Sequence, residues 1–352
     1  MIKTLLIIIL LFNITSFGEE AVIPLPPISP KQEASIKKER SKISADPAPI
    51  TTIKRINKER QKILNIKRLI LGVVQDGGDL YLPLTTSLCL TMNEVNSKAC
   101  RVKQYQDNNN AVRGLINGEI DLLITNSLVV KDLMQEMPPF NDKIDKSRIR
   151  FVNYFFSEAF LAFSKKENSL QNLSDLQARP INSSSESLEK IIATIRKNKG
   201  WTSQVTDSHF TKKDQIISLC NGSIKVASFL AELLNQEVKD ITKSCQVNVI
   251  KFSQEEITQM TKDMGFFPYR LPGGIYLGLP EATDTIAIKA VALTTSDLTD
   301  SQAKFFLDNL VTNLPSLQKL HVALGELTFD NTFANPLFTE HEAVKSFKDQ
   351  RN

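Results

Sequence analysis

A glycine-rich turn at the start of a predicted helix is the first feature of this sequence suited to binding chemistry. Gly77 and Gly78 follow an apolar run at residues 69–74, and Asp79 is a suitable N-cap for the next helix. Glycines let a backbone approach a bound molecule closely, and the free N–H groups of a first helical turn attract anions. The turn indicates an anion-binding site, with a plain strand-to-helix turn as the alternative.

Two arginines could bind the carboxylate group of an anionic ligand. A guanidinium group can hold a carboxylate through two parallel hydrogen bonds, and Arg113 and Arg270 are the candidates for such a clamp. Arg270 is favoured because it lies close to Pro272, in a segment expected to lead back between two lobes. For both residues an ordinary surface arginine is the alternative.

Residues typical of enzymes and metal sites lack the required spacing. His209, His321 and His341 are widely separated, and the chain contains no H-E-x-x-H pattern, no G-x-S-x-G elbow and no phosphate-binding Gly-Lys-Ser/Thr loop. Acid pairs such as Asp76 and Asp79 are expected by chance among 39 acidic residues. We therefore predict no enzyme activity, no catalytic residue, no metal site and no cofactor.

Four cysteines are compatible with disulfides, and none lies in a C-x-x-C pair. Pairing in sequence order gives Cys89 with Cys100 and Cys220 with Cys245. Only the second bridge is favoured, because its loop of about 24 residues is easy to close. Cys89 lies inside a predicted helix and is also explained as a small buried hydrophobe. The pairing therefore stays open.

Alternating apolar runs and amphipathic segments give the elements that position these residues. Strands are predicted at 69–74, 101–105 and 120–125, with helices at 79–95 and 109–117 between them. This order predicts βαβ units in a mainly parallel sheet.

A second α/β set begins with two predicted strands. The remaining strands are predicted at 150–155, 159–163, 224–229, 247–252 and 286–294, and helices at 187–197, 214–219 and 301–310. Together the two sets predict two α/β lobes that are joined by strand crossings near residues 157 and 286. Ligands of open α/β sheets bind beyond the carboxyl ends of strands, so a cleft between the lobes is the expected site.

The first 18 residues have the pattern of a secretory signal peptide. Lys3 gives a positive start, residues 5–12 are apolar, and Ser16 and Gly18 supply small residues for cleavage before Glu19. The apolar run is shorter than the ~20 residues of a comfortable membrane span. Export and cleavage after Gly18 are predicted, and retention as an uncleaved membrane anchor is the alternative.

A basic, proline-containing tether is predicted over residues 19–66, largely disordered or partly helical. Between Lys31 and Arg68 there are 12 Lys or Arg against four Asp or Glu, whereas the rest of the chain is nearly neutral. The simplest interpretation is a solvated tether, and attraction to an anionic membrane surface is the functional alternative. No nucleic-acid partner is predicted for an exported chain.

Several segments resemble the TAXI family (TRAP-associated extracytoplasmic immunogenic proteins), the solute-binding subunits of TRAP transporters. Residues 77–83, Gly-Gly-Asp-Leu-Tyr-Leu-Pro, match a glycine-rich turn followed by an aromatic residue and a proline. Residues 117–121, Asn-Gly-Glu-Ile-Asp, match a Gly-Glu-x-Asp pattern, and residues 271–276, Leu-Pro-Gly-Gly-Ile-Tyr, are a further anchor. The resemblance covers about residues 69–347.

The resemblance implies a type II periplasmic binding protein fold: two α/β lobes joined by two strand crossings, with a ligand cleft between them. Lobe 1 would comprise 67–157 and 286–352, and lobe 2 would comprise 158–285. A periplasmic protein of this kind delivers a small organic anion, a glutamate-like amino acid or a dicarboxylate, to TRAP-type membrane permease subunits. Motif positions and residue chemistry together give these candidate ligand-binding residues: Gly77, Gly78, Asp79, Tyr81, Asn108, Asn126, Ser127, Ser184, Ser185, Arg270 and Tyr276.

The sequence departs from the family pattern around the expected ligand. A Gly-Ser-Gly-Thr turn of the second lobe is replaced by residues 184–187, Ser-Ser-Glu-Ser, and a glycine-containing stretch of the first lobe by residues 105–111. Fewer glycines hold the backbone further from a ligand, and Glu186 adds negative charge. A simple dicarboxylate is therefore disfavoured. An envelope interaction or antigenic protein with a diverged pocket is the alternative function.

Overall fold

The computed structural model describes residues 67–74, 78–140, 144–201 and 210–351. These lie in a compact unit, Gln61–Asn352. The predicted signal peptide and tether, residues 1–66, lie outside the described residues. Within the described ranges, no helix is both long and apolar enough to cross a membrane.

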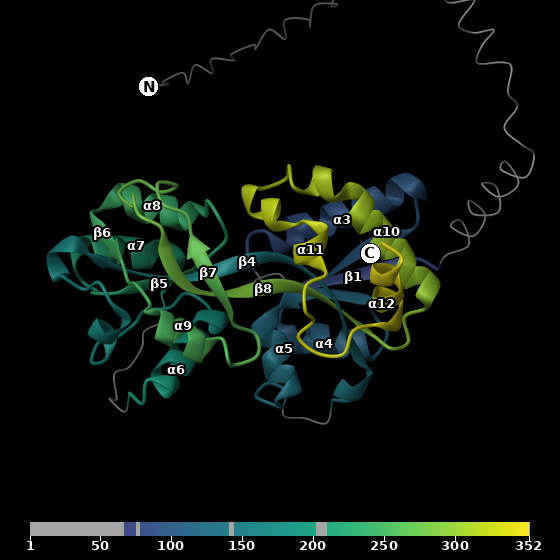
Figure 1. The fold of residues 1–352 in the computed structure, drawn as a ribbon, viewed down its shortest axis with the longest axis horizontal. Helices are drawn as coiled ribbons and strands as arrows, with labels where there is room; N and C mark the ends of the chain where they lie inside the picture. The colour runs from purple at the N-terminus through teal and green to yellow at the C-terminus, as the bar shows by residue number, and fades with distance from the viewer. Residues whose placement is uncertain (1–66, 75–77, 141–143, 202–209, 352) are drawn as a thin grey trace, which may run out of the picture. The chain divides into compact units, whose positions relative to one another are not determined.

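A single mixed sheet of eight strands runs through the described part of the chain, in the order β2-β1-β3-β8-β4-β5, with β6 paired to β4 and β7 to β8 (Figure 1). β1 pairs in parallel with β2 and β3, as the βαβ pattern predicts, and β8 runs antiparallel to β3. The strands are β1 (Leu69–Val74), β2 (Cys100–Tyr105), β3 (Leu122–Asn126), β4 (Ile149–Lys165), β5 (Ala227–Ala231), β6 (Val247–Val249), β7 (Phe267–Leu271) and β8 (Thr283–Thr295).

Helices cover both faces of this sheet. Most begin at a side-chain cap, such as Asp107 before α4, Asn126 before α5 and Thr211 before α7. The α-helices are α3 (Tyr81–Val95), α4 (Asn108–Ile116), α5 (Ser127–Met134), α6 (Glu186–Asn198), α7 (Lys212–Asn221), α8 (Gln236–Ser244), α9 (Gln254–Met260), α10 (Asp300–Leu317), α11 (Phe329–Thr332) and α12 (Glu342–Asp349), and the 3₁₀ turns are η1 (Lys146–Arg148), η2 (Lys166–Asn168), η3 (Leu173–Leu176) and η4 (Val322–Glu326).

Two long strands carry the chain between the lobes. β4 and β8 pair antiparallel from Ile149 opposite Thr295 to Ala159 opposite Ala287. The sequence predicted two short strands in place of β4, and this is wrong: the strand is continuous, and register shifts between residues 151 and 157 absorb the irregularity. The two crossings and the strand order confirm the predicted type II periplasmic binding protein fold.

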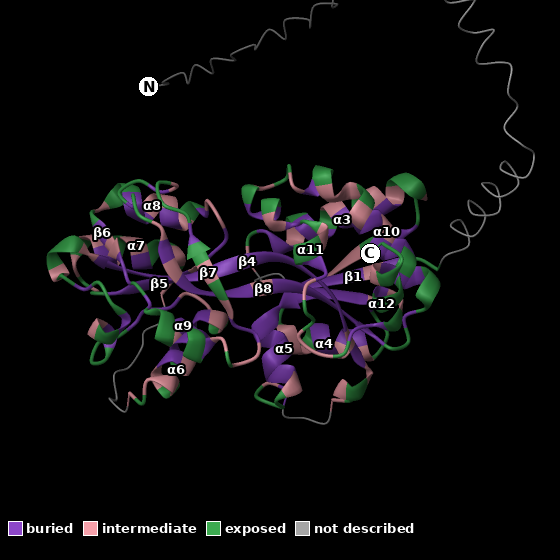
Figure 2. Ribbon diagram, viewed as in Figure 1, coloured by how far each residue is buried: buried purple, intermediate pink, exposed green. Residues whose placement is uncertain are grey.

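Apolar side chains fill both faces of the sheet on each side of the crossing. In the first lobe, α3 and α10 pack through Leu88 and Phe306 on one face, and α4 and α5 pack on the other face (Figure 1). In the second lobe, α6 and α9 enclose one cluster with Ile192, and α7 and α8 another with Phe229 and Val238. Most strand residues are buried, whereas the outer helix faces and part of β7 are exposed (Figure 2).

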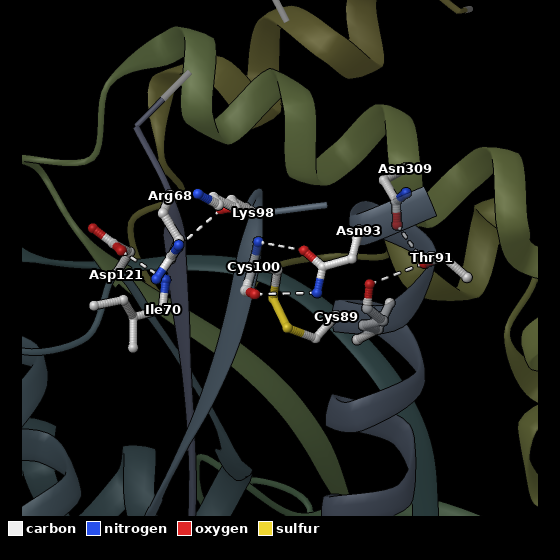
Figure 3. The surroundings of a disulfide bond; sticks show 10 residues. Arg68, Ile70, Cys89, Thr91, Asn93, Lys98, Cys100, Asp121 and Asn309 are labelled. Atoms are coloured by element: carbon white, nitrogen blue, oxygen red, sulfur yellow. Dashed lines mark hydrogen bonds between the residues drawn. A yellow bond between two sulfur atoms is a disulfide. The ribbon is translucent and has the colours of Figure 1, made fainter. Parts of the chain in front are cut away.

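All four cysteines are oxidised. Cys89–Cys100 joins α3 to the first residue of β2, so the expectation that Cys89 is only a buried hydrophobe is wrong. Figure 3 shows why these residues meet: the Asn93 side chain, one turn after Cys89, both accepts from Cys100 N at 2.9 Å and donates to Cys100 O at 3.1 Å. The favoured bridge, Cys220–Cys245, is also present and joins the C-terminal ends of α7 and α8.

Removing either bridge should destabilise the fold. Because each closes a loop of moderate length (sequence separations 11 and 25), we expect Cys→Ala at both cysteines of one bridge to lower the free energy of unfolding by about 3 kcal/mol. Urea denaturation measures the loss as a lower midpoint. A variant lacking all four cysteines is the control, since reductant should lower the midpoint of the natural chain and leave that variant unchanged. Equal midpoints for natural chain and variants would contradict the prediction.

Candidate functional site

The two lobes meet where their strands end and their helices begin. α3 and α5 begin after β1 and β3 on the first-lobe side, and α6, α7 and α8 begin on the second-lobe side. The polar contacts that join the lobes there include Lys212 Nζ to Asp79 Oδ2 at 3.1 Å, Lys190 Nζ to Asp132 Oδ2 at 2.7 Å, and Asn126 Nδ2 to Ser187 Oγ at 3.5 Å. The candidate site is the group of residues 78, 79, 81, 158, 212 and 232, hereafter the interlobe site.

A buried carboxyl group lies at the centre of the interlobe site. Glu158 sits on β4 with 5% of its surface exposed, and the hydroxyl of Tyr81, the first residue of α3, donates to its Oε2 at 2.6 Å. Burial raises the pKa of Glu158 to about 8, helped by the nearby carboxylates of Glu232 and Asp79, while the Tyr81 hydrogen bond and Lys212 lower it. At neutral pH the group therefore holds a proton for much of the time.

Tyr81, unlike an exposed tyrosine, has a buried hydroxyl group beside a carboxyl group. Its side chain is fully buried, and burial together with the adjacent Glu158 carboxyl raises the pKa of its hydroxyl well above the ordinary value. The hydroxyl consequently keeps its proton and remains a donor to Glu158 throughout the physiological range. Its ring packs edge-on against Phe156, with 5.2 Å between ring centroids, which fixes the direction of that hydrogen bond.

Lys212 is the cation of the interlobe site. Its Nζ lies 3.1 Å from Asp79 Oδ2 in the first lobe and 2.9 Å from Glu237 Oε1 in the second. Burial lowers the pKa of Lys212, but hydrogen bonds to Glu237 and Asp79 outweigh it, so the pKa is raised and the ammonium stays charged. The Thr211 side chain caps α7 and sets the position of this lysine at the helix start.

The predicted residues of β3 and α4 lie at the same edge of the first lobe. Asn126 Oδ1 caps α5 by accepting from Leu128 N and Val129 N, which leaves its Nδ2 directed at Ser187 of the second lobe. Asn108 Oδ1 accepts from Thr125 Oγ1 at 3.1 Å. These two side chains border the contact between the lobes.

Ser127 has a different environment from its neighbour Asn126. Its side chain is completely buried, and its Oγ donates to Gly265 O at 2.6 Å and accepts from Lys289 N at 3.0 Å. Both partners are backbone groups of the protein, so the hydroxyl holds the loop before β7 against β8.

The serine turn of the second lobe begins α6. Ser185 Oγ accepts from Leu188 N at 3.3 Å as the N-cap, and Ser184 is half-buried beside it. Glu186 follows, and its carboxylate pairs at 2.8 Å with Lys190, whose ammonium also lies 2.7 Å from Asp132 of the first lobe. One lysine is thus shared by two carboxylates, so the turn keeps the extra negative charge that its sequence indicated.

Arg270 is exposed and paired outside the interlobe site, whereas the Tyr276 hydroxyl lies 3.5 Å from Glu232 O, next to a residue of that site. The Arg270 side chain is 69% exposed on β7, and its Nη1 lies 2.9 Å from Asp284 Oδ1 on the adjacent strand. Tyr276 is buried in the second-lobe core, where its hydroxyl accepts from Asn235 N at 3.0 Å. Tyr276 thus supports the turn that follows Glu232. Gly77, the remaining predicted residue, lies outside the described residues.

Three residues of the interlobe site were not predicted: Glu158, Glu232 and Lys212. A usable signal existed for Glu158, because it is a lone acid in the apolar stretch that forms β4, next to the crossing predicted near residue 157. Glu232 and Lys212 carry no such signal, since a Glu after a short strand or a Lys at a helix start is common on any protein surface.

Glu158 should make stability depend on pH. Its folded-state pKa of about 8 exceeds the ordinary value of 4.5, so between these values the folded state binds more protons than the unfolded state. Relative to Glu158→Gln, the natural chain should therefore lose stability as pH rises from about 4.5 to about 8, by up to about 1.4 kcal/mol per pH unit.

Urea unfolding at pH 5, 6, 7 and 8 measures this difference. Glu255→Gln, at an exposed glutamate of α9, is the matched control and should follow the natural chain at every pH. A stability difference between Glu158→Gln and the natural chain that stays constant across this range would show that Glu158 titrates normally.

Several solved structures are similar to this chain. The aliphatic sulphonate binding protein SsuA from Escherichia coli is 12% identical with a TM-score of 0.47, over 82% of this chain and 84% of that chain. XAC2383 from Xanthomonas citri bound to ATP is 11% identical with a TM-score of 0.45, over 82% and 100% of the chains. Tv2483 bound to L-arginine is 12% identical with a TM-score of 0.44, over 79% and 96%.

A family assignment comes from the sequence itself. No curated protein matches the chain. The profile of the NMT1-like family, however, matches residues 76–350, from the turn after β1 to the end of α12, and so includes both lobes and both crossing strands. The chain therefore belongs to the NMT1-like family, which is of the periplasmic solute-binding type.

Proposed function

We propose that this chain is an exported, non-catalytic solute-binding protein that captures a small organic solute between its lobes and delivers it to a TRAP-type membrane permease. The observation that carries the proposal is the interlobe site, where Lys212 of the second lobe and Asp79 of the first meet beside buried Glu158. Such a site is assembled only when the lobes come together, which is the requirement for capture by closure.

The ion pair between Lys212 and Asp79 is weak enough to be opened and reformed. Asp79 is 62% exposed and Lys212 41% exposed, and an exposed ion pair contributes about 0–1 kcal/mol. The continuous strands β4 and β8, the pair of Lys190 with Asp132 and the hydrogen bond from Ser127 to Gly265 also join the lobes. A ligand that contacts both lobes would therefore shift the equilibrium toward closure through its own differential affinity.

A small organic anion, either a glutamate-like amino acid or a dicarboxylate, remains the proposed ligand class. Lys212 is the described cation best placed for its carboxylate, because it already holds Asp79 and can exchange that carboxylate for one on the ligand. Arg270 is a weaker candidate, since it is exposed and bonded to Asp284.

The TRAP-type partner rests on the motifs of the TAXI resemblance, chiefly residues 77–83 and 271–276. Periplasmic localisation rests on the signal-peptide pattern of residues 1–18. Mass spectrometry of the exported chain tests the signal peptide and the localisation, and an N-terminus at Glu19 is the expected result.

A permease subunit encoded beside this chain, or captured by the purified protein, would support the TRAP-type partner.

An envelope interaction or antigenic role is the second candidate function. One observation favours it: the turn before α6 uses the Ser185 hydroxyl as its cap and lacks the glycines that would bring backbone N–H groups to a ligand. A protein of this kind would retain the fold but no longer bind a solute.

A ligand screen separates the two functions. Ligand at about 1,000 times its dissociation constant stabilises the folded state by about 4 kcal/mol, so an amino acid, dicarboxylate or oxo acid that binds should raise the melting temperature by several degrees. Small-angle scattering with the same compound should report a more compact protein. If no compound raises the melting temperature, solute binding is contradicted and the interaction role is supported.

Lys212→Met tests the proposed carboxylate contact. We expect it to weaken binding of a carboxylate ligand more than tenfold in calorimetry, because a hydrogen bond to a charged group contributes about 1.5–3 kcal/mol. Lys243→Met, at an exposed lysine of α8, is the matched control and should bind as the natural chain does. Equal affinity of the two variants would remove Lys212 from the site.

A further inference from the structure

We infer that the interlobe site selects solutes that carry a protonated amine, held by the carboxyl groups of Glu158 and Glu232. The inference rests on the proposed solute-binding function and names the chemical group that the site recognises. Amines and amino acids should therefore bind better than dicarboxylates and oxo acids that lack an amine. The family resemblance alone does not make this distinction.

One carboxyl oxygen of Glu158 can accept a hydrogen bond from a ligand. Its Oε2 accepts from the Tyr81 hydroxyl at 2.6 Å, whereas its Oε1 accepts no hydrogen bond from any described residue, although the side chain is 95% buried. Gly78 faces this oxygen with φ of +125°, and a Cβ there would lie 3.0 Å from Oε1. A side chain at this position would crowd both Oε1 and the Tyr81 ring, whose Cδ2 would lie 3.1 Å from that Cβ, so glycine leaves Oε1 able to accept from a bound molecule.

The charges around Glu158 favour a cation. Among the described residues, the carboxylates that act on it are those of Glu232 and Asp79, and the cation that acts on it is Lys212. That ammonium is already shared between Asp79 and Glu237. Glu232 is itself 8% exposed, and its two oxygens accept only from Asn235 Nδ2, at 3.2 Å, among the described residues. A protonated amine would supply the missing positive charge, whereas a second carboxylate would add to the excess.

Binding of an amine at this position should release a proton. Glu158 is largely protonated at neutral pH in the empty protein because burial raises its pKa to about 8, and an adjacent ammonium favours the ionised form. The Tyr81 hydroxyl remains a donor to the ionised carboxylate, since its own pKa is raised well above the ordinary value. Affinity for an amine should therefore increase as pH rises from 6 to 8.

Matched pairs of probes test the inference by calorimetry. The pairs are glutamate with 2-oxoglutarate, 4-aminobutanoate with butanoate, and 1,4-diaminobutane with succinate. We expect at least one amine to bind more than tenfold tighter than its amine-free partner, and heats measured at pH 7 in buffers of different ionisation enthalpy to show proton release.

Glu158→Gln distinguishes charge recognition from hydrogen bonding alone. It should weaken the amine more than tenfold, abolish the proton release, and leave any binding of the amine-free partner unchanged or tighter. Glu255→Gln is the control for charge removal, and an unchanged circular dichroism spectrum establishes that Glu158→Gln folds. Retained affinity for the amine in Glu158→Gln would overturn the inference.

The outcomes separate this inference from the function on which it rests. Binding of amine-free probes as tight as that of their amine partners would overturn amine selection and leave solute binding intact. Absence of binding by every probe, together with no thermal shift in the wider screen, would overturn both.

Discussion

The pairing of β4 with β8 is the interaction on which the rest of the structure depends. These antiparallel strands connect the lobes by backbone hydrogen bonds, and they are buried over nearly their whole length. Hydrophobic clusters lie on both sides of the crossing. The strands also fix Glu158, on β4, within reach of the Tyr81 hydroxyl. The fold and the candidate site therefore share one constraint.

Much of this fold follows from local patterns in the sequence. The apolar runs of the first lobe identify β1, α3, β2, α4 and β3 to within a few residues, because β1 and β3 are buried along nearly their whole length and the helices between the strands are amphipathic. The prediction that Asp79 caps α3 was wrong, because Leu80 is the N-cap and makes no side-chain cap bond. The continuity of β4 was missed, because Ser157 and Glu158 interrupt an apolar run and resemble a turn. In the folded chain Ser157 Oγ donates to Glu326 Oε2 at 2.7 Å, a contact 169 residues away in sequence that no local pattern contains.

The candidate site was predictable in part for the same reason. Gly78, Asp79 and Tyr81 belong to one continuous motif, and the structure brings them to the interlobe site. Glu232 and Lys212 reach it from two other elements, so their relevance depends on tertiary packing. Arg270 illustrates the converse: its chemistry suits a carboxylate, but strand pairing with β8 supplies Asp284 as a partner within the protein. Residue chemistry identifies what a side chain can bind, and packing decides what it meets.

The Cys220–Cys245 bridge has a consequence for where the protein can work. It ties the C-terminal ends of α7 and α8, while Lys212 and Glu237 pair at the N-terminal ends of the same two helices. The two helices are thus joined at both ends, and Lys212 at the N-terminus of α7 also pairs with Asp79. Disulfides form in oxidising compartments and rarely in the cytosol. A chain in the cytosol would therefore have the ion pair without the disulfide, and both connections between the helices would be complete only in an oxidising compartment.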